Sequence, residues 1–182
     1  MNEPDTKRAA HRAFFALWPD DATRAALVRA SRALVAASGG RAVPAENLHV
    51  TLAFLGELGE DEFEAVHRVT APKVGPFELT IDRTGFRKRA QLLWAAPRDV
   101  LPALIALEAG LWERLEEIGI ERERRAYLPH VTLARKARRA AGEFSPVRWP
   151  VTEMALVEST LGPPNSTYSV ARTWSLSRRD SG

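Results

Sequence analysis

One tetrapeptide, His-Val-Thr-Leu, occurs twice in this chain of 182 residues, at positions 49–52 and 130–133. Both copies lie in short runs of β-branched and apolar residues, a pattern typical of buried strands. Side chains two apart on a strand point to the same face of the sheet. Each copy is therefore expected to hold an imidazole and a hydroxyl side by side on one face, with its valine and leucine turned into a core.

Histidine is scarce in the chain, and its distribution favours a catalytic role for the repeat. Only four histidines are present, and two of them fall in the two tetrapeptides. A lone histidine on an apolar strand is more often a structural residue, but packing explains an identical pair poorly. Because imidazole titrates near neutral pH, two such rings can supply one general base and one general acid. We interpret His49 and His130 as this pair, with the assignment of base and acid left open, and His11 and His67 as surface residues.

The sequence around both motifs resembles that of the two-histidine phosphoesterases. Segments 48–56 and 129–135 are most similar to the bacterial and archaeal RNA 2′,3′-cyclic phosphodiesterases, historically called 2′-5′ RNA ligases. The resemblance covers nearly the whole chain, including the opening strand at 12–17 and the closing segment at 168–176. It implies hydrolysis of RNA 2′,3′-cyclic phosphate ends to a 2′-phosphomonoester by metal-independent acid/base catalysis, accompanied by weak, reversible 2′-5′ joining.

Further residues are expected to bind the substrate around the histidines. The hydroxyls of Thr51 and Thr132 can donate hydrogen bonds to the non-bridging phosphate oxygens. Arg135 occupies the position at which the resemblance implies a phosphate-binding arginine, and a guanidinium can bind two phosphate oxygens at once. Phe14 and Phe15 must face opposite sides of their strand. By position Phe15 matches the family's recurring phenylalanine, so it is the candidate for stacking on a base.

The hydrophobic pattern predicts an α+β domain. Strands are expected at 12–18, at both motifs, and at 77–86, 91–96, 151–161 and 168–176, and helices at 20–38, 60–74 and 99–119. Strand, helix and motif strand recur in each half. We therefore predict a bilobal, pseudo-twofold domain in which two antiparallel-rich sheets face a central cleft and the helices lie outside. The length suits a single domain over 1–182, with flexible polar tails at 1–11 and 177–182.

Composition excludes several kinds of site. The chain has no cysteine, and therefore no disulfide, thiolate nucleophile or cysteine-ligated metal. Two histidines without an acid in either motif make a poor zinc site, so no metal and no cofactor are expected. No stretch approaches the roughly 20 apolar residues of a membrane span, and position 1 onward lacks a signal peptide pattern, so a cytoplasmic location is expected.

The expected partner is RNA, or an oligonucleotide, that ends in a 2′,3′-cyclic phosphate. The net charge of +3 is mild, but basic residues cluster at 83–89 and 135–139, so part of this charge is expected near the site. The protein is expected to act as a monomer. Other readings stay open: another cyclic or 2′-5′ linked nucleotide as substrate, an RNA-end-binding module without turnover, or histidines that bind a metal.

Overall fold

The computed structural model describes residues 10–122, 126–139, 142–162 and 166–177. The parts of the predicted tails at 1–9 and 178–182 lie outside these residues. The strands are β1 (His11–Leu17), β2 (Arg41–Ala42), β3 (Val50–Leu58), β4 (Phe77–Ile81), β5 (Arg83–Arg87), β6 (Leu92–Ala96), β7 (Val131–Arg135), β8 (Val147–Val151), β9 (Glu153–Thr160) and β10 (Thr167–Ser175). One eight-stranded sheet has the order β10-β9-β1-β3-β7-β6-β5 with β2 paired to β7, and a second sheet pairs β4 with β8. The α+β class with antiparallel strands is confirmed.

The helices of the described residues are α1 (Asp21–Ser38), the 3-10 turn η1 (Ala45–Asn47), α2 (Glu60–His67) and α3 (Pro102–Glu117). Helix α1 begins and ends where the sequence predicts: the Asp20 side chain accepts a hydrogen bond from the Thr23 amide at 2.7 Å, and Gly39 ends the helix with a φ of 67°. Proline favours the first turn of a helix, and α3 accordingly begins at Pro102. In the part of the chain that the structure describes, no helix is both long and apolar enough to cross a membrane.

Two elements differ from the prediction because of proline. Helix α2 ends at His67, whereas the pattern predicts a helix to residue 74. Pro72 accounts for the early end, because its ring excludes the preceding turn from a helix. Strand β8 is not predicted by the pattern, since prolines flank and interrupt it. Pro150 is tolerated there because β8 belongs to a two-stranded sheet and has a free edge.

The two motif strands are neighbours in the large sheet. Strands β3 and β7 pair antiparallel through a single position, Val50 opposite Val131. Both valines are fully buried, as the alternation predicts. Because two directly opposed residues of an antiparallel pair are related by a local twofold axis, this axis also relates the flanking histidines and threonines of the two motifs. The halves are thus joined in one sheet, where the sequence predicts a sheet for each half.

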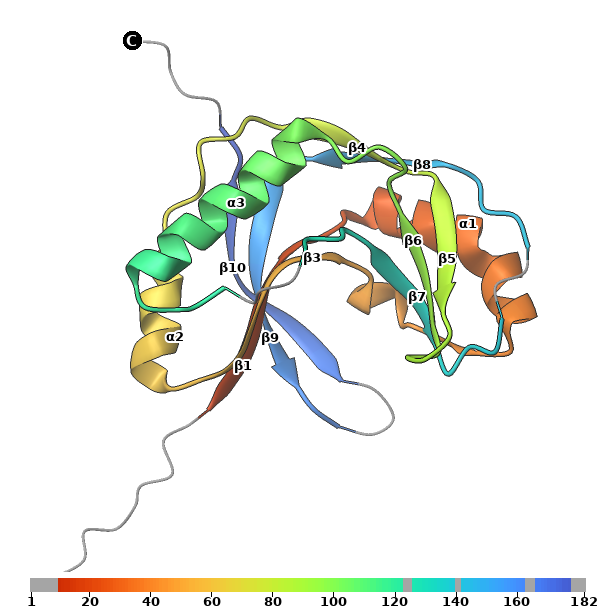
Figure 1. The fold of residues 1–182 in the computed structure, drawn as a ribbon, viewed down its shortest axis with the longest axis horizontal. Helices are drawn as coiled ribbons and strands as arrows, with labels where there is room; N and C mark the ends of the chain where they lie inside the picture. The colour runs from red at the N-terminus through yellow and green to blue at the C-terminus, as the bar shows by residue number, and fades with distance from the viewer. Residues whose placement is uncertain (1–9, 123–125, 140–141, 163–165, 178–182) are drawn as a thin grey trace, which may run out of the picture.

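Helices α1 and α3 each pack against strands from the other half of the sequence. Helix α1 follows β1 in the chain but contacts β7 and β8, whereas α3 follows β6 but contacts β3 (Figure 1). Each motif strand is therefore supported by a helix from the other half of the sequence. These helix contacts link the two halves of the chain, whose motif strands β3 and β7 pair at only one position.

His11 begins β1, although the sequence pattern places it in a tail. Its Nδ1 lies 2.6 Å from Glu158 Oε1 and its Nε2 lies 3.0 Å from Glu60 Oε2. The ring also stacks on Phe63, with 4.0 Å between ring centroids. The hydrogen bonds to Glu158 and Glu60 raise the pKa of His11 above its ordinary value.

We expect His11 to make the stability of the protein depend on pH. A histidine whose pKa is raised on folding contributes stability that is fully present below its unfolded pKa of about 6.5 and is lost as the pH rises through the folded pKa. His11→Gln should therefore lower the free energy of unfolding at about pH 5.5, with a difference from wild type that shrinks toward about pH 9. Urea unfolding across this range measures the difference. His67→Gln is the control, because His67 forms no ion pair with a described residue. A difference that does not change with pH would contradict the assignment.

Candidate active site

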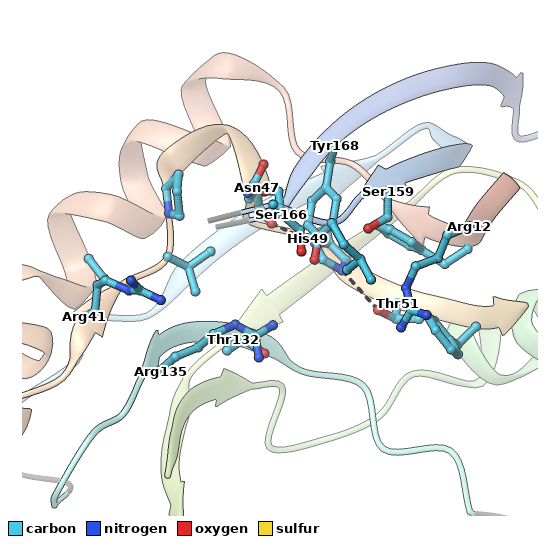
Figure 2. Close-up of a pocket in the computed structure, with 17 residues that line it drawn as sticks. Arg12, Arg41, Asn47, His49, Thr51, Thr132, Arg135, Ser159, Ser166 and Tyr168 are labelled. Carbon is cyan, nitrogen blue, oxygen red and sulfur yellow. Dashed lines mark hydrogen bonds between the residues drawn. The ribbon is translucent and has the colours of Figure 1, made fainter. Parts of the chain in front are cut away.

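A pocket of about 580 Å³ opens on the face of the sheet that carries His49 (Figure 2). This volume falls within the range of small-ligand sites. Four of the residues predicted from the sequence line it together: His49, Thr51, Thr132 and Arg135. In Figure 2, Thr132 and Arg135 come from β7, across the pocket from His49.

His130 lines an adjoining hollow of about 160 Å³ and does not line the main pocket. Thr51 and Phe54 line both spaces, which therefore adjoin at these two residues. The antiparallel register puts His130 on the side of Thr51, and Thr132 on the side of His49. The two imidazoles therefore lie diagonally across the Val50–Val131 pair, as the local twofold axis requires.

Both histidines are held in the same way by the main chain. His49 Nδ1 lies 2.7 Å from the carbonyl oxygen of Asn47, and His130 Nδ1 lies 2.8 Å from that of Leu128. A carbonyl oxygen only accepts, so Nδ1 of each ring carries a hydrogen and donates it. In the neutral ring, Nε2 is then the free base. For His49 this nitrogen lies 3.1 Å from Thr51 Oγ1, which donates to it.

Aromatic side chains surround His49. Phe14 and Trp18 lie 4.8 and 5.6 Å from its ring centroid, and Tyr168 meets it edge-on at 5.5 Å. Burial, with a smaller effect from the positive charges of His130 and Arg135, outweighs the opposing effect of the Asn47 carbonyl and lowers the pKa of His49 to about 4. At neutral pH His49 is therefore uncharged and can accept a proton at Nε2.

The base-stacking prediction for Phe15 is wrong. Its side chain has no exposed surface and packs in the core, 5.4 Å from Trp174. Phe14 is the member of the pair that lines the pocket, where it contacts His49. The predicted opposition of the two rings is confirmed, but the residue assigned to the cleft is the wrong one.

Sequence reasoning missed several residues of the pocket. Asn47 is 7% exposed, and its Nδ2 donates to the carbonyl of Ser166 at 2.9 Å, which ties the start of the first motif to the approach of β10. Arg12 lies over the ring of Phe54 at 5.0 Å, and Arg41 stands opposite Arg135 in the β2–β7 pair. Of these, only Asn47 had a local signal, its place two residues before the motif histidine.

Residues from the second half of the chain also support the first motif strand, from the side of the smaller hollow. Tyr127 donates its hydroxyl hydrogen to the carbonyl of Thr51 at 3.2 Å. Beside it, Glu108 is 4% exposed and accepts hydrogen bonds from Arg122 at 2.7 and 2.9 Å. Burial raises the pKa of both Glu108 and Tyr127. Among the described residues, no three histidine, aspartate or glutamate side chains gather closely enough to hold a metal ion.

Comparison with known proteins identifies the family. The 2′-5′ RNA ligase superfamily model matches residues 18–163. RNA 2′,3′-cyclic phosphodiesterases of Thermus thermophilus and Escherichia coli are each 33% identical to this chain, over 91% and 76% of it and 90% and 81% of theirs. The crystal structure of E. coli LigT complexed with 3′-AMP is 29% identical with a TM-score of 0.80, covering 93% of this chain and 100% of that one. The crystal structure of TT0787 of T. thermophilus is 30% identical with a TM-score of 0.77, covering 92% and 99%. The chain therefore belongs to the RNA 2′,3′-cyclic phosphodiesterase family within the 2′-5′ RNA ligase superfamily.

Proposed function

We propose that this protein hydrolyses the 2′,3′-cyclic phosphate end of RNA to a 2′-phosphomonoester with two histidines and without a metal or cofactor. The observation that carries the proposal is the pair of imidazoles at the starts of neighbouring strands, each with Nδ1 bound to a main-chain carbonyl, so that Nε2 has no main-chain partner. The names of the T. thermophilus and E. coli relatives support the reaction. The 2′ position of the product follows from the resemblance.

His49 is proposed as the general base and His130 as the general acid. The low pKa of His49 keeps Nε2 unprotonated, so it can take a proton from the attacking water. The water oxygen bonds to phosphorus, the bond from phosphorus to the 3′ oxygen breaks, and His130 gives its Nε2 proton to that oxygen. After the reaction His49 is protonated and His130 is neutral, the reverse of their starting states. Exchange of protons with water restores both rings. When an RNA 5′-hydroxyl replaces water, the same steps form a 2′-5′ linkage.

The pocket is proposed to hold the phosphate between the two motifs. When the phosphate is bound, the Thr51 hydroxyl turns from His49 Nε2 to a non-bridging oxygen, which frees Nε2 for the water. Thr132 donates to a second non-bridging oxygen, and Arg135 offsets the charge that develops on both. All three side chains line the same pocket. Phe14, Trp18 and Tyr168 contact the His49 ring and hold it in place. The bilobal arrangement, the monomeric state and the cytoplasmic location stay predictions.

A short RNA with a 2′,3′-cyclic phosphate end tests the function directly. The purified protein is incubated with this RNA in EDTA, and the position of the phosphate in the product is mapped. We expect a 2′-phosphate end. Recovery of only the 3′-phosphate would keep the enzyme class and reject the proposed product, whereas binding without turnover would reject the enzyme.

The assignment of His49 as base predicts an unusually acidic limb in the pH–rate profile. The value of kcat/KM reports the groups of the free enzyme, and a base loses activity as the pH falls through its pKa. With the pKa of His49 lowered to about 4, activity should persist well below pH 6. The limb belongs to the coupled pair of histidines, so it is compared between variants. Trp18→Ala should expose His49 to water and move the limb to higher pH. Circular dichroism at each pH controls for unfolding, and a limb that stays in place in this variant would count against His49.

A further inference from the structure

The face of the sheet that carries the pocket continues beyond it onto β6 and β5. Directly opposed residues of neighbouring strands point to the same face. Thr132, which lines the pocket, stands opposite Trp94, and Trp94 stands opposite Gly85. Neighbouring strands lie about 4.8 Å apart, so this row reaches about 10 Å from the motif strand to β5.

Trp94, together with Arg83, forms a flat and positively charged platform in this row. A Cβ atom at Gly85 would lie 2.1 Å from the Trp94 ring, so the indole rests directly on the glycine. The guanidinium of Arg83 lies over the same ring, 5.5 Å from its centroid. Trp94 is half-buried and Arg83 is exposed. Aromatic rings and guanidinium planes are the surfaces on which proteins stack unpaired RNA bases.

A second row supplies positive charge beside the platform. Arg41 stands opposite Arg135, Arg135 opposite Leu92, and Leu92 opposite Arg87. Together with Arg83, these arginines place four guanidinium groups on one face. None of the four forms an ion pair with a described residue. Clustered cations that are not paired with carboxylates are suited to a polyanion.

We propose that the part of this surface on β5 and β6, the arginine face (Arg83, Arg87 and Trp94), binds single-stranded RNA immediately 5′ of the cyclic phosphate end. The inference rests on the proposed function, which puts the terminal phosphate in the pocket beside Thr132 and Arg135. From there the strand crosses β7 and β6 toward β5, with phosphates on the arginines and a base against the Trp94–Arg83 platform. Stacking and phosphate contacts are sequence-tolerant, so the face recognises the strand and its unpaired state, not its sequence.

Binding of RNA of different lengths tests the inference. Dissociation constants are measured for a single nucleotide and a hexanucleotide that both end in a 2′-phosphate. Wild type should bind the hexanucleotide about fivefold more tightly or better, since one stacked base alone has at least this effect. In Arg83→Gln/Arg87→Gln the hexanucleotide should lose most of this advantage, with binding of the nucleotide changed less than about twofold. The slope of log K against log salt should fall by about 1.4 in magnitude, about 0.7 for each lost phosphate contact on a single strand.

Arg29→Gln/Arg32→Gln is the matched control, because it removes the same charge from exposed positions on α1. Trp94→Leu tests the platform separately and should weaken only the hexanucleotide. Length-independent binding, an equal loss in the control, or equal affinity for the same hexanucleotide in a duplex would each overturn the inference. Hydrolysis of a mononucleotide 2′,3′-cyclic phosphate is assayed in parallel. Turnover without length-dependent binding rejects the arginine face alone, and length-dependent binding without turnover rejects the proposed function alone.

Discussion

Replacement of either motif histidine by alanine is expected to reduce kcat by about 10²–10⁴, the usual contribution of a positioned general acid or base. His49→Ala removes the proposed acceptor of the water proton, and His130→Ala removes the proposed donor to the leaving 3′ oxygen. Single-turnover hydrolysis of an RNA with a 2′,3′-cyclic phosphate end measures both losses. The pH profile adds a second readout: His49→Ala should lose the acidic limb, and His130→Ala should keep it.

The double variant distinguishes a working pair from two independent residues. Groups that act as a unit are strongly non-additive, so His49→Ala/His130→Ala should lose far less than the product of the two single losses. His67→Ala serves as the control, because it removes a histidine from α2 that lies outside both pockets. EDTA should leave wild-type activity unchanged. Near-full activity in either single variant, or an enzyme silenced by chelation and revived by zinc, would replace the two-imidazole mechanism with a metal-dependent one.

Arg135→Ala should lower kcat by about 10²–10³, the effect of removing one donor from a group that stabilises transition-state charge. Arg135 is the proposed cation nearest the phosphate, since it lines the pocket with Thr132 on the same strand. Arg135→Lys should recover part of the rate, because an ammonium keeps the charge but cannot bind two oxygens as a planar fork. The same single-turnover assay measures both variants.

Arg138→Ala is the control for Arg135. It removes an equal charge three residues further on, from an exposed side chain outside the pocket. Its rate should stay within about twofold of wild type, as for exposed residues that contact no substrate. If Arg135→Ala and Arg138→Ala behaved alike, the arginine that offsets the phosphate charge would have to be sought elsewhere, with Arg12 and Arg41 as the other pocket-lining candidates.

The parts of the fold that follow from nearby residues could be predicted from the sequence. Helix α1 has an aspartate at its start and a glycine at its end, and the structure shows both as caps. Alternation in the motifs predicts which side chains enter the core, and Val50 and Val131 are fully buried. Such signals depend on the geometry of a single strand or helix, which the local sequence determines.

The surroundings of the site depend on contacts between distant segments, which a single sequence does not display. Alternation puts Phe14 and Phe15 on opposite faces of the strand, but it does not determine which of the two enters the core and which lines the pocket. The choice is made by β9 and β10, because Phe14 packs with Val157 and Tyr168 against His49. Two register shifts within β1 add to the ambiguity. Likewise, the two basic clusters are visible in the sequence, but only the order β7-β6-β5 places Arg83 and Arg87 on the face that carries Arg135.

The atoms that fix the two imidazole tautomers belong to the backbone. The carbonyl oxygens of Asn47 and Leu128 remain whatever side chain occupies either position, so substitution there does not delete the acceptor. In sites where a carboxylate orients the histidine, one point mutation can abolish that orientation. Here the orientation depends on the course of the main chain. One residue inserted between Asn47 and His49 would remove this hydrogen bond, which no replacement of the side chain at position 47 would do. Insertions and deletions, more than substitutions, are the changes to which the proton arrangement of this protein is vulnerable.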